Sequence, residues 1–218
     1  MPFEVGAALG LVYQTAHFAL IERAAMKPGD TVLVLGASGG VGSAAVQLAS
    51  AMGAGIVIGG VKGARNAELA RAAGCDETVD LGMDNLRDGL RDKVRMATDG
   101  HGVDVVIDPV GGAVTEAALR AMAWRGRLVV VGFAAGEIPT IKANYLLVKN
   151  IAVSGLQWSD YRERDPAWVH RVQQDIFDLW SQGKLSPQIA DTLPLDQFSD
   201  ALQRLQEGRA HGKIILTP

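Results

Sequence analysis

The chain has 218 residues, 48% of them hydrophobic and 21% charged, and its formal net charge is -3 at pH 7. This composition is typical of a globular protein, and the charge excludes a general electrostatic attraction to nucleic acid or to an anionic membrane. No apolar run reaches the roughly 18 residues of a membrane span, and the first residues lack the basic flank and apolar stretch of a secretory signal. We therefore expect a cytoplasmic protein that binds neither nucleic acid nor membrane.

Cysteine and histidine are too sparse for a disulfide framework or a metal centre. Cys75 is the single cysteine, and its place between a predicted helix and a predicted strand indicates a small semi-buried residue. Zinc sites need clusters of cysteine and histidine ligands, so the sequence predicts no metal site. The histidines are scattered and none stands beside the cysteine: His17, His101, His170 and His211.

The first 25 residues predict a helical lead-in. Apolar residues recur there at helical spacing, at Leu9, Val12, Ala16 and Ala19. A turn with the sequence Lys-Pro-Gly-Asp follows at residues 27–30 and separates the lead-in from the next region.

Residues 26–158 alternate short apolar runs with helical patterns, which indicates βαβ units and a parallel sheet. Strands are predicted, in chain order, over residues 31–35, 56–61, 78–80, 103–108, 127–132 and 151–155. Helices are predicted over residues 41–52, 66–73, 86–96 and 114–123. Six strands with helical crossovers predict an α/β fold with a doubly wound, six-stranded parallel sheet of the Rossmann type.

Residues 159–218 have a different pattern, with helices predicted at 166–182 and 196–206 and short strands at 189–193 and 213–216. These strands do not continue the parallel sheet. We interpret the tail as a third region whose helices and strands would return to a substrate domain. Exposed strand edges invite pairing, so the tail also predicts that the chain self-associates.

A glycine-rich segment, residues 36–42 (Gly-Ala-Ser-Gly-Gly-Val-Gly), joins the first predicted strand to the first helix. A helix N-terminus binds pyrophosphate through backbone N–H groups and the positive end of the helix dipole. Gly39 and Gly40 allow close approach of a phosphate, and Gly42 allows the helix to pack against the sheet. The strict G-x-G-x-x-G pattern is broken at Ala37, and a glycine turn alone could be structural. Its place between a buried strand and an Ala-rich helix favours the pyrophosphate of a nicotinamide dinucleotide.

The end of the second predicted strand indicates which nicotinamide cofactor is bound. NAD-binding domains place Asp or Glu there to bind the ribose 2′-hydroxyl. Here Lys62 and Arg65 follow the strand, and no acidic residue precedes Glu68. We therefore predict NADP(H), with both cations at the 2′-phosphate. The alternative is that they are solvated loop charges.

Two further loops, residues 108–112 and 132–136, follow the fourth and fifth predicted strands. Ligands of open α/β sheets bind at the carboxyl ends of strands. The small residues of these loops would let the backbone pass close to a flat ring system, although either loop alone could be a turn.

Together these segments resemble the medium-chain dehydrogenase/reductase superfamily, and in particular its zinc-free NADPH:quinone oxidoreductases. The resemblance covers nearly the whole chain, with several motifs in the same order. The segments that carry it are residues 12–16, 36–42, 108–112, 126–133, 146–150, 155–158 and 212–216.

The resemblance implies which residues bind the cofactor. Ser38, Gly39, Gly40 and Val41 would line the pyrophosphate, Lys62 and Arg65 the 2′-phosphate, and Thr15, Val110, Phe133 and Ala134 the rest of the cofactor, the nicotinamide end included. Trp158 and Lys213 are weaker candidates, with packing at an interface and a solvated strand end as alternatives. Asn66 departs from the family, which often has Lys there. No catalytic acid or base is nominated.

The resemblance also implies hydride transfer from NADPH to a quinone or an activated double bond, and a homodimer formed around residues 151–155. Family members begin with a GroES-like barrel of roughly a hundred residues that forms one wall of the cleft, and this chain has no counterpart of it. We therefore expect impaired activity from this chain alone. The alternatives are a non-catalytic NADP(H)-binding module and an inactive fragment.

A short-chain dehydrogenase is a further alternative, because Tyr145 and Lys149 fit a Tyr-x-x-x-Lys motif. That family also needs a serine upstream of the tyrosine, where this chain has only residues 132–135 (Gly-Phe-Ala-Ala). Its first strand would also start closer to the N-terminus than Thr31. We interpret the motif as coincidental.

Overall fold

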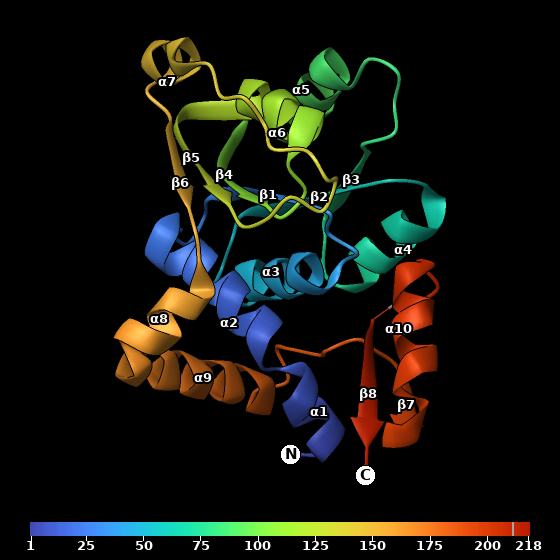
Figure 1. Cartoon of the computed structure of the whole chain (residues 1–218). Helices are drawn as coiled ribbons and strands as arrows, with labels where there is room; N and C mark the ends of the chain where they lie inside the picture. Colours follow the sequence, from blue (N-terminus) through green and yellow to red (C-terminus); the bar gives the residue numbers. More distant parts are fainter. Residues whose placement is uncertain (211) are drawn as a thin grey trace.

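A six-stranded parallel sheet lies at the centre of the computed structural model, which describes residues 1–210 and 212–218 (Figure 1). The strands are β1 (Thr31–Leu35), β2 (Ile56–Val61), β3 (Glu77–Asp80), β4 (Val103–Asp108), β5 (Met122–Val130) and β6 (Ala152–Gly155). Their order across the sheet is β3-β2-β1-β4-β5-β6, the Rossmann order, so the predicted fold is confirmed. The order reverses between β1 and β4, and such folds bind their dinucleotide in the crevice at this point.

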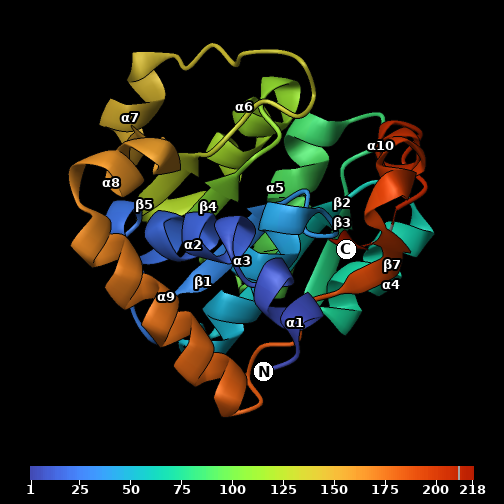
Figure 2. The same cartoon turned by 60° about the horizontal axis from the view of Figure 1, so that its bottom comes forward.

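Helices cover both faces of the sheet (Figures 1 and 2). One face carries α2 (Leu11–His17), α3 (Gly40–Ala51), α4 (Ala64–Ala72) and α9 (Pro166–Ser181), and the other carries α5 (Leu86–Ala97) and α6 (Gly112–Ala121). Alternate residues of β1 serve the two faces. Val32 and Val34 pack under α3, whereas Leu33 and Leu35 pack under α5 and α6. A strand buried on both faces reads as a continuous apolar run, which is why β1 could be predicted.

The lead-in is helical, as predicted, but it is made of three pieces. These are α1 (Phe3–Ala8), α2 and a π-helix, η1 (Phe18–Arg23). Gly10 interrupts the first two, because its ψ of -117° is not helical. Phe18 is buried, and its ring centroid lies 4.6 Å from that of Tyr161 and 5.6 Å from that of Trp168. The lead-in is therefore part of the same core as the sheet and the tail.

The start of β5 differs from the prediction. The strand begins at Met122 rather than at Arg127, and the helix before it ends two residues earlier than predicted. Met122 already has an extended backbone and pairs with Val103, and Arg125 has a φ of 65°. Ala-rich sequence suggested a longer helix, but pairing with β4 ends it. Apart from this strand, the predicted bounds agree with the structure to within about two residues.

Two short helices were not predicted, α7 (Ala143–Lys149) and α8 (Trp158–Arg164). The first contains the Tyr-x-x-x-Lys spacing. The Lys149 ammonium donates to the carbonyl oxygens of Arg120 and Met122, both at 2.8 Å, and so caps the end of α6. The Tyr145 hydroxyl instead accepts from Arg87 at 3.2 Å. The two motif residues therefore have separate structural roles, which agrees with interpreting the motif as coincidental.

The tail forms its own small sheet, separate from the large one, as predicted. Strands β7 (Ile189–Pro194) and β8 (Lys213–Thr217) pair in parallel, with η2 (Leu195–Gln197) and α10 (Phe198–Gln206) between them in the chain. Helix α1 contacts both strands. The assignment of this tail to a substrate domain stays a prediction. No helix in the described part of the chain is long and apolar enough to cross a membrane.

Candidate dinucleotide-binding site

The glycine loop between β1 and α3 makes a tight turn in which glycine is favoured at Gly36 and required at Gly42. Gly36 has a φ of 65° and donates its N–H to the Gly60 carbonyl at 2.8 Å. A Cβ on Gly42 would lie 2.0 Å from the Gly36 carbonyl oxygen, because α3 presses directly on the loop. Such a contact excludes any side chain. The predicted packing role of Gly42 is therefore confirmed.

The N-terminus of α3 is open to an anion. Gly39 occupies the N-cap position in an extended conformation, and no described side chain caps the helix. The first N–H groups of a helix lack partners within it and point outward along the positive end of the dipole. Gly39 and Gly40 are exposed, and Ser38 and Val41 are partly buried beside them. This arrangement fits the phosphate oxygens of a dinucleotide.

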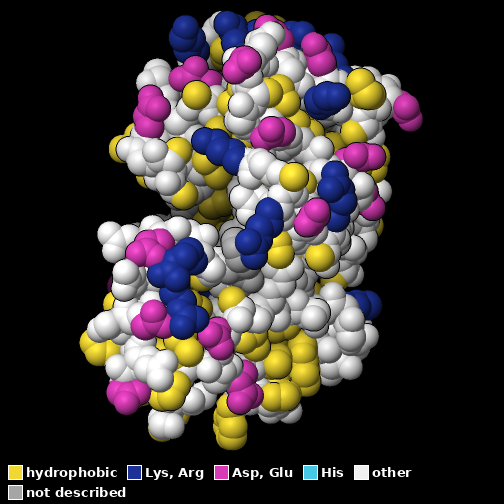
Figure 3. Space-filling model, turned by 90° about the vertical axis from the view of Figure 1, so that its right-hand side faces the viewer, with side chains coloured by type: hydrophobic (Ala, Val, Ile, Leu, Met, Phe, Trp, Pro, Cys, Tyr) yellow, Lys and Arg dark blue, Asp and Glu magenta, His cyan; other side chains and the backbone are white. Residues whose placement is uncertain are grey.

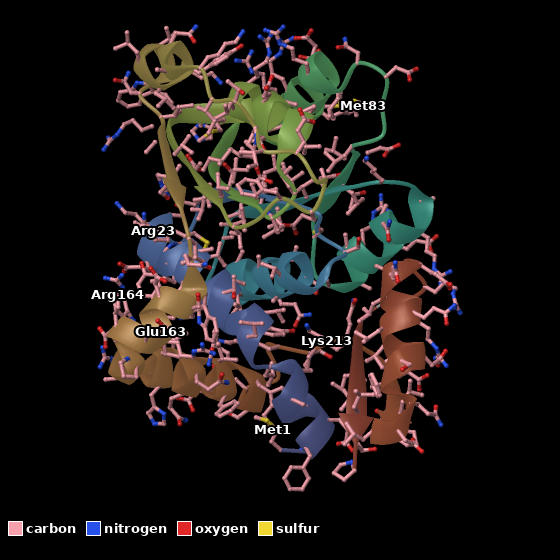
Figure 4. All side chains as sticks on the ribbon, viewed as in Figure 1. Met1, Arg23, Met83, Glu163, Arg164 and Lys213 are labelled. Atoms are coloured by element: carbon pink, nitrogen blue, oxygen red, sulfur yellow. The ribbon has the colours of Figure 1, made fainter. Side chains whose placement is uncertain are left out.

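Lys213 lies against this open helix end. The sequence indicated it only as a weaker candidate for binding the cofactor. A Cβ on Gly40 would stand 3.6 Å from the Lys213 ammonium nitrogen. Figure 4 shows Lys213 in the space between α1, α3 and the start of β8. A cavity of about 230 Å³ separates the loop from the tail, and its lining includes Tyr13, Ser38, Gly39, Gly40, Gln188 and Lys213. Burial lowers the pKa of the Lys213 ammonium. This ammonium and the uncapped N-terminus of α3 line the same cavity.

Backbone geometry fixes the position of Lys213. Gly212 has a φ of 130°, and a Cβ there would lie 2.6 Å from the Gln188 carbonyl oxygen. The same oxygen accepts the Lys213 N–H at 2.8 Å. The closing Gly-Lys pair was recognised only through the family resemblance, because nothing in its spacing connects it with a loop far back in the chain.

The predicted 2′-phosphate end lies between β2 and α4. Lys62 and Arg65 are both exposed, and within the described ranges neither forms an ion pair. Asn66 stands where the family often has Lys. Its side-chain amide donates to the Lys62 carbonyl at 2.8 Å and so holds the backbone at Lys62. Figure 3, seen from the side of α4 and α10, shows a hollow with Lys and Arg side chains on both sides of it.

One carboxylate near these cations was missed. The Oδ1 atom of Asp80 accepts the N–H of Gly63 at 3.4 Å and that of Gly82 at 2.9 Å. Asp80 ends β3 rather than β2, so a search restricted to the end of the second strand passes over it. Its negative charge therefore stands beside the segment that carries the positive charges of Lys62 and Arg65.

The two remaining loops meet at the carboxyl ends of β4 and β5. The N–H groups of Ala134 and Ala135 donate to the carbonyls of Pro109 and Val110 at 3.1 and 2.9 Å. Val110 also packs on the glycine loop, where a Cβ on Gly36 would lie 3.0 Å from its side chain. The loops that the sequence singled out therefore form one continuous surface, with Phe133 exposed to 43% at its edge.

Two candidates are less accessible. Thr15 is only 8% exposed, and its hydroxyl donates to the Leu11 carbonyl at 2.8 Å, within its own helix. Trp158 is partly buried against the core, with the Arg162 guanidinium 5.6 Å from its ring centroid. Both therefore have structural contacts of their own.

The residues present do not fit a zinc ion. Among the described residues, no three His, Cys, Asp or Glu side chains come together as metal ligands. Cys75 is buried, and burial raises the pKa of its thiol to about 12. Zinc binds thiolates and neutral imidazoles in groups of three or four, so we derive no zinc chemistry from this chain.

Comparison with known proteins agrees with this geometry. A family model described as zinc-binding dehydrogenase matches residues 40–174. The quinone oxidoreductase-like protein 2 homolog of Nematostella vectensis is 36% identical over 217 residues, which are 99% of this chain and 58% of that protein. The chain thus spans less than two thirds of this curated relative.

Solved structures of similar proteins also match nearly the whole of this chain with about two thirds of their own length. The mycobacterial protein Rv1454c complexed with NADPH is 30% identical with a TM-score of 0.88, over 99% of this chain and 66% of that one. A 2-haloacrylate reductase is 30% identical with a TM-score of 0.86, over 97% of this chain and 65% of that one. Family model, sheet order and relatives all agree. The chain belongs to the zinc-binding dehydrogenase family, among the medium-chain dehydrogenases/reductases whose members include quinone oxidoreductase-like proteins.

Proposed function

We propose that this chain binds NADP(H) and forms the cofactor-binding half of an oxidoreductase that reduces a quinone or an activated double bond. The observation that carries the proposal is the uncapped N-terminus of α3 with the Lys213 ammonium beside it, both lining one cavity. A dianionic pyrophosphate suits this combination of backbone donors and one cation. The names of the relatives support the reaction class, and the NADPH complex of one of them supports the cofactor.

The chain's own residues would hold and orient the cofactor. Backbone groups of residues 38–41 and the Lys213 ammonium would bind the pyrophosphate, and Lys62 and Arg65 the 2′-phosphate. Val110, Phe133 and Ala134, with Thr15 behind them, would line the nicotinamide end. NADPH would supply the hydride, and the protein's part is position and a dry pocket. We nominate no acid or base, since reduction of a quinone can take its proton from water.

A non-catalytic NADP(H)-binding module is the second candidate. Residues 132–136, which would face the nicotinamide, are open to solvent in the described structure, with Phe133 exposed to 43% and Ala134 also exposed. An open loop leaves the reacting carbon in water, and closure normally assembles such sites. Slow turnover by this chain alone would favour the first candidate and absent turnover the second, whereas NADPH binding is required by both.

Steady-state oxidation of NADPH with 1,4-benzoquinone tests the proposal. We expect slow turnover that requires NADPH and weakens in Lys213→Ala. Binding without any turnover favours the module. Turnover unchanged in Lys213→Ala contradicts the site described above. Lys184→Ala, at an exposed lysine that lies outside the lining of the loop cavity, is the matched control.

We also propose a homodimer through β6, which is an edge strand of the large sheet. An open edge presents unpaired backbone groups to a second copy, and two-fold symmetry would pair it with itself. A single monomeric mass over a wide concentration range in light scattering would contradict this part of the proposal.

A further inference from the structure

A carboxylate with no cationic partner is buried at the end of β4. Asp108 is 0% exposed, and in the described ranges no Lys, Arg or His pairs with it. Its Oδ1 accepts the N–H groups of Val110 and Gly111, both at 2.9 Å, and its Oδ2 accepts the hydroxyl of Thr115. Thr115 is also 0% exposed. Burying a charge is costly unless hydrogen bonds compensate. These three bonds provide the compensation, and to keep them the turn must hold Val110, Gly111 and Thr115 around the carboxylate.

The same residue joins three segments. Its side chain holds residues 110–111 and, through Thr115, the first turns of α6. Its backbone carbonyl accepts the N–H groups of Val131 and Gly132 at 2.8 and 3.3 Å. Asp108 is thus the common hydrogen-bond partner of its own loop, of α6 and of the segment that follows β5.

The loop that Asp108 holds has little room to move. Gly111 has a φ of 79°, and a Cβ there would lie 2.8 Å from the Glu137 carbonyl oxygen. The carbonyls of Pro109 and Val110 accept N–H groups of the next loop, at Ala134 and Ala135. A shift of the first loop is therefore transmitted to residues 132–136.

We propose that Asp108 and Thr115 are a positioning pair that fixes residues 109–112, and through them residues 132–136, at the nicotinamide end of the cofactor. The inference rests on the proposed function. Strands β4 and β5 lie on the opposite side of the switch point from β2, where Lys62 and Arg65 would bind the 2′-phosphate. The pair therefore acts chiefly on the nicotinamide half of the site, and its link to the other half is the Val110 side chain, which packs beside Gly36 of the glycine loop.

Two ligands separate the two halves: NADPH spans the whole site, whereas 2′,5′-ADP occupies only the adenosine half. In Asp108→Asn the amide NH₂ replaces one carboxylate oxygen, so either the backbone N–H groups lose their acceptor or the Thr115 hydroxyl must turn round and accept, and in Thr115→Val the hydroxyl is lost. We expect either change to lower NADPH affinity by about tenfold or more and to lower 2′,5′-ADP affinity much less. Thr115→Ser keeps the hydroxyl and should retain NADPH affinity.

Asp104→Asn is the matched control. Asp104 is a carboxylate on the same strand, and it accepts the N–H of Thr31 at 2.9 Å and its hydroxyl at 2.8 Å. It lies at the opposite end of β4, so its loss should lower stability without separating the two ligands. Thr115→Val tests the pair independently if Asp108→Asn fails to fold.

Calorimetric titration of each variant with NADPH and with 2′,5′-ADP tests the inference. Selective loss of NADPH affinity supports the inference. Equal loss of both affinities, or no loss in folded variants, overturns it while wild-type binding leaves the proposed function intact. A wild-type chain that binds neither ligand overturns the proposed function and this inference with it.

Discussion

The side-chain amide of Gln47 pairs with the backbone of Ser186, 139 residues further along the chain. Its Oε1 accepts the Ser186 N–H at 2.8 Å, and its Nε2 donates to the Ser186 carbonyl at 3.0 Å. The Tyr13 hydroxyl donates to the same Oε1 at 2.9 Å. One helical residue therefore joins the lead-in, the large sheet region and the tail. The position of Lys213 at the glycine loop depends on these three hydrogen bonds, because Ser186 precedes β7, the strand that pairs with β8.

Gln47→Leu should lower the free energy of unfolding by about 2–4 kcal/mol, because two backbone groups and a buried hydroxyl lose their partner. Urea denaturation followed by circular dichroism measures the change. Gln174→Leu is the control, since in the described part of the chain its amide forms one exposed bond, to Asp178, and its loss should matter by less than about 0.5 kcal/mol. An equal loss of unfolding free energy in the two variants would show that the hydrogen bonds of Gln47 contribute little to stability.

Gly42→Ala should disrupt the loop. Its Cβ would stand 2.0 Å from the Gly36 carbonyl oxygen, so α3 or the loop must move, at a cost of about 1–3 kcal/mol or more. Gly6→Ala is the control, because Gly6 lies within α1 and its Cβ would make an ordinary contact of 3.5 Å with the Met1 sulfur, so this change should be tolerated. Thermal unfolding of both variants, with NADPH titrations of whichever fold, checks this. A Gly42→Ala protein with wild-type stability and NADPH affinity would contradict the geometry.

Charge at the end of β2 should set cofactor choice. Lys62→Ala and Arg65→Ala should each weaken NADPH binding by about tenfold at low salt and leave NADH binding unchanged. Asp80→Asn should strengthen NADPH binding, because it removes a negative charge beside the loop. Fluorescence titrations at two salt concentrations measure both effects. If NADPH and NADH respond alike, these side chains do not bind the 2′-phosphate.

His17 should make stability depend on pH. Burial lowers the pKa of His17 below its ordinary value of 6.5, although Asp175 at 3.9 Å acts in the opposite direction. The unfolded chain then binds a proton first as pH falls, so stability is complete above pH 6.5 and decreases from there down to the folded pKa.

His17→Gln should flatten this slope, measured as urea midpoints between about pH 5 and 8. His170→Gln, at an exposed histidine, should keep it. A slope unchanged by His17→Gln would assign the pH dependence to other groups.

Sequence patterns predicted the parts of this molecule that local chemistry determines. The apolar run of β1 is buried on both faces, and Gly42 is required where α3 meets the loop. Both signals lie within a few residues of the structure they specify. Local signals of this kind located the sheet and the glycine loop, and the family was recognised from several such segments in the same order.

Contacts between distant segments could not be read in the same way. Lys213 reaches the glycine loop only because the tail folds back over α3, and Asp80 reaches Gly63 only because β3 lies next to β2. The early start of β5 depends on pairing between Met122 and Val103. Each needs the tertiary arrangement, which periodicity and spacing do not contain.

A side-by-side calorimetric titration of the purified chain with NADPH and NADH tests the central claim most directly. We predict one NADPH site per chain, an affinity at least about tenfold above that for NADH, and a clear loss in Lys213→Ala. Equal affinities would contradict the assignment of NADP(H), and binding of neither cofactor would contradict the dinucleotide site itself.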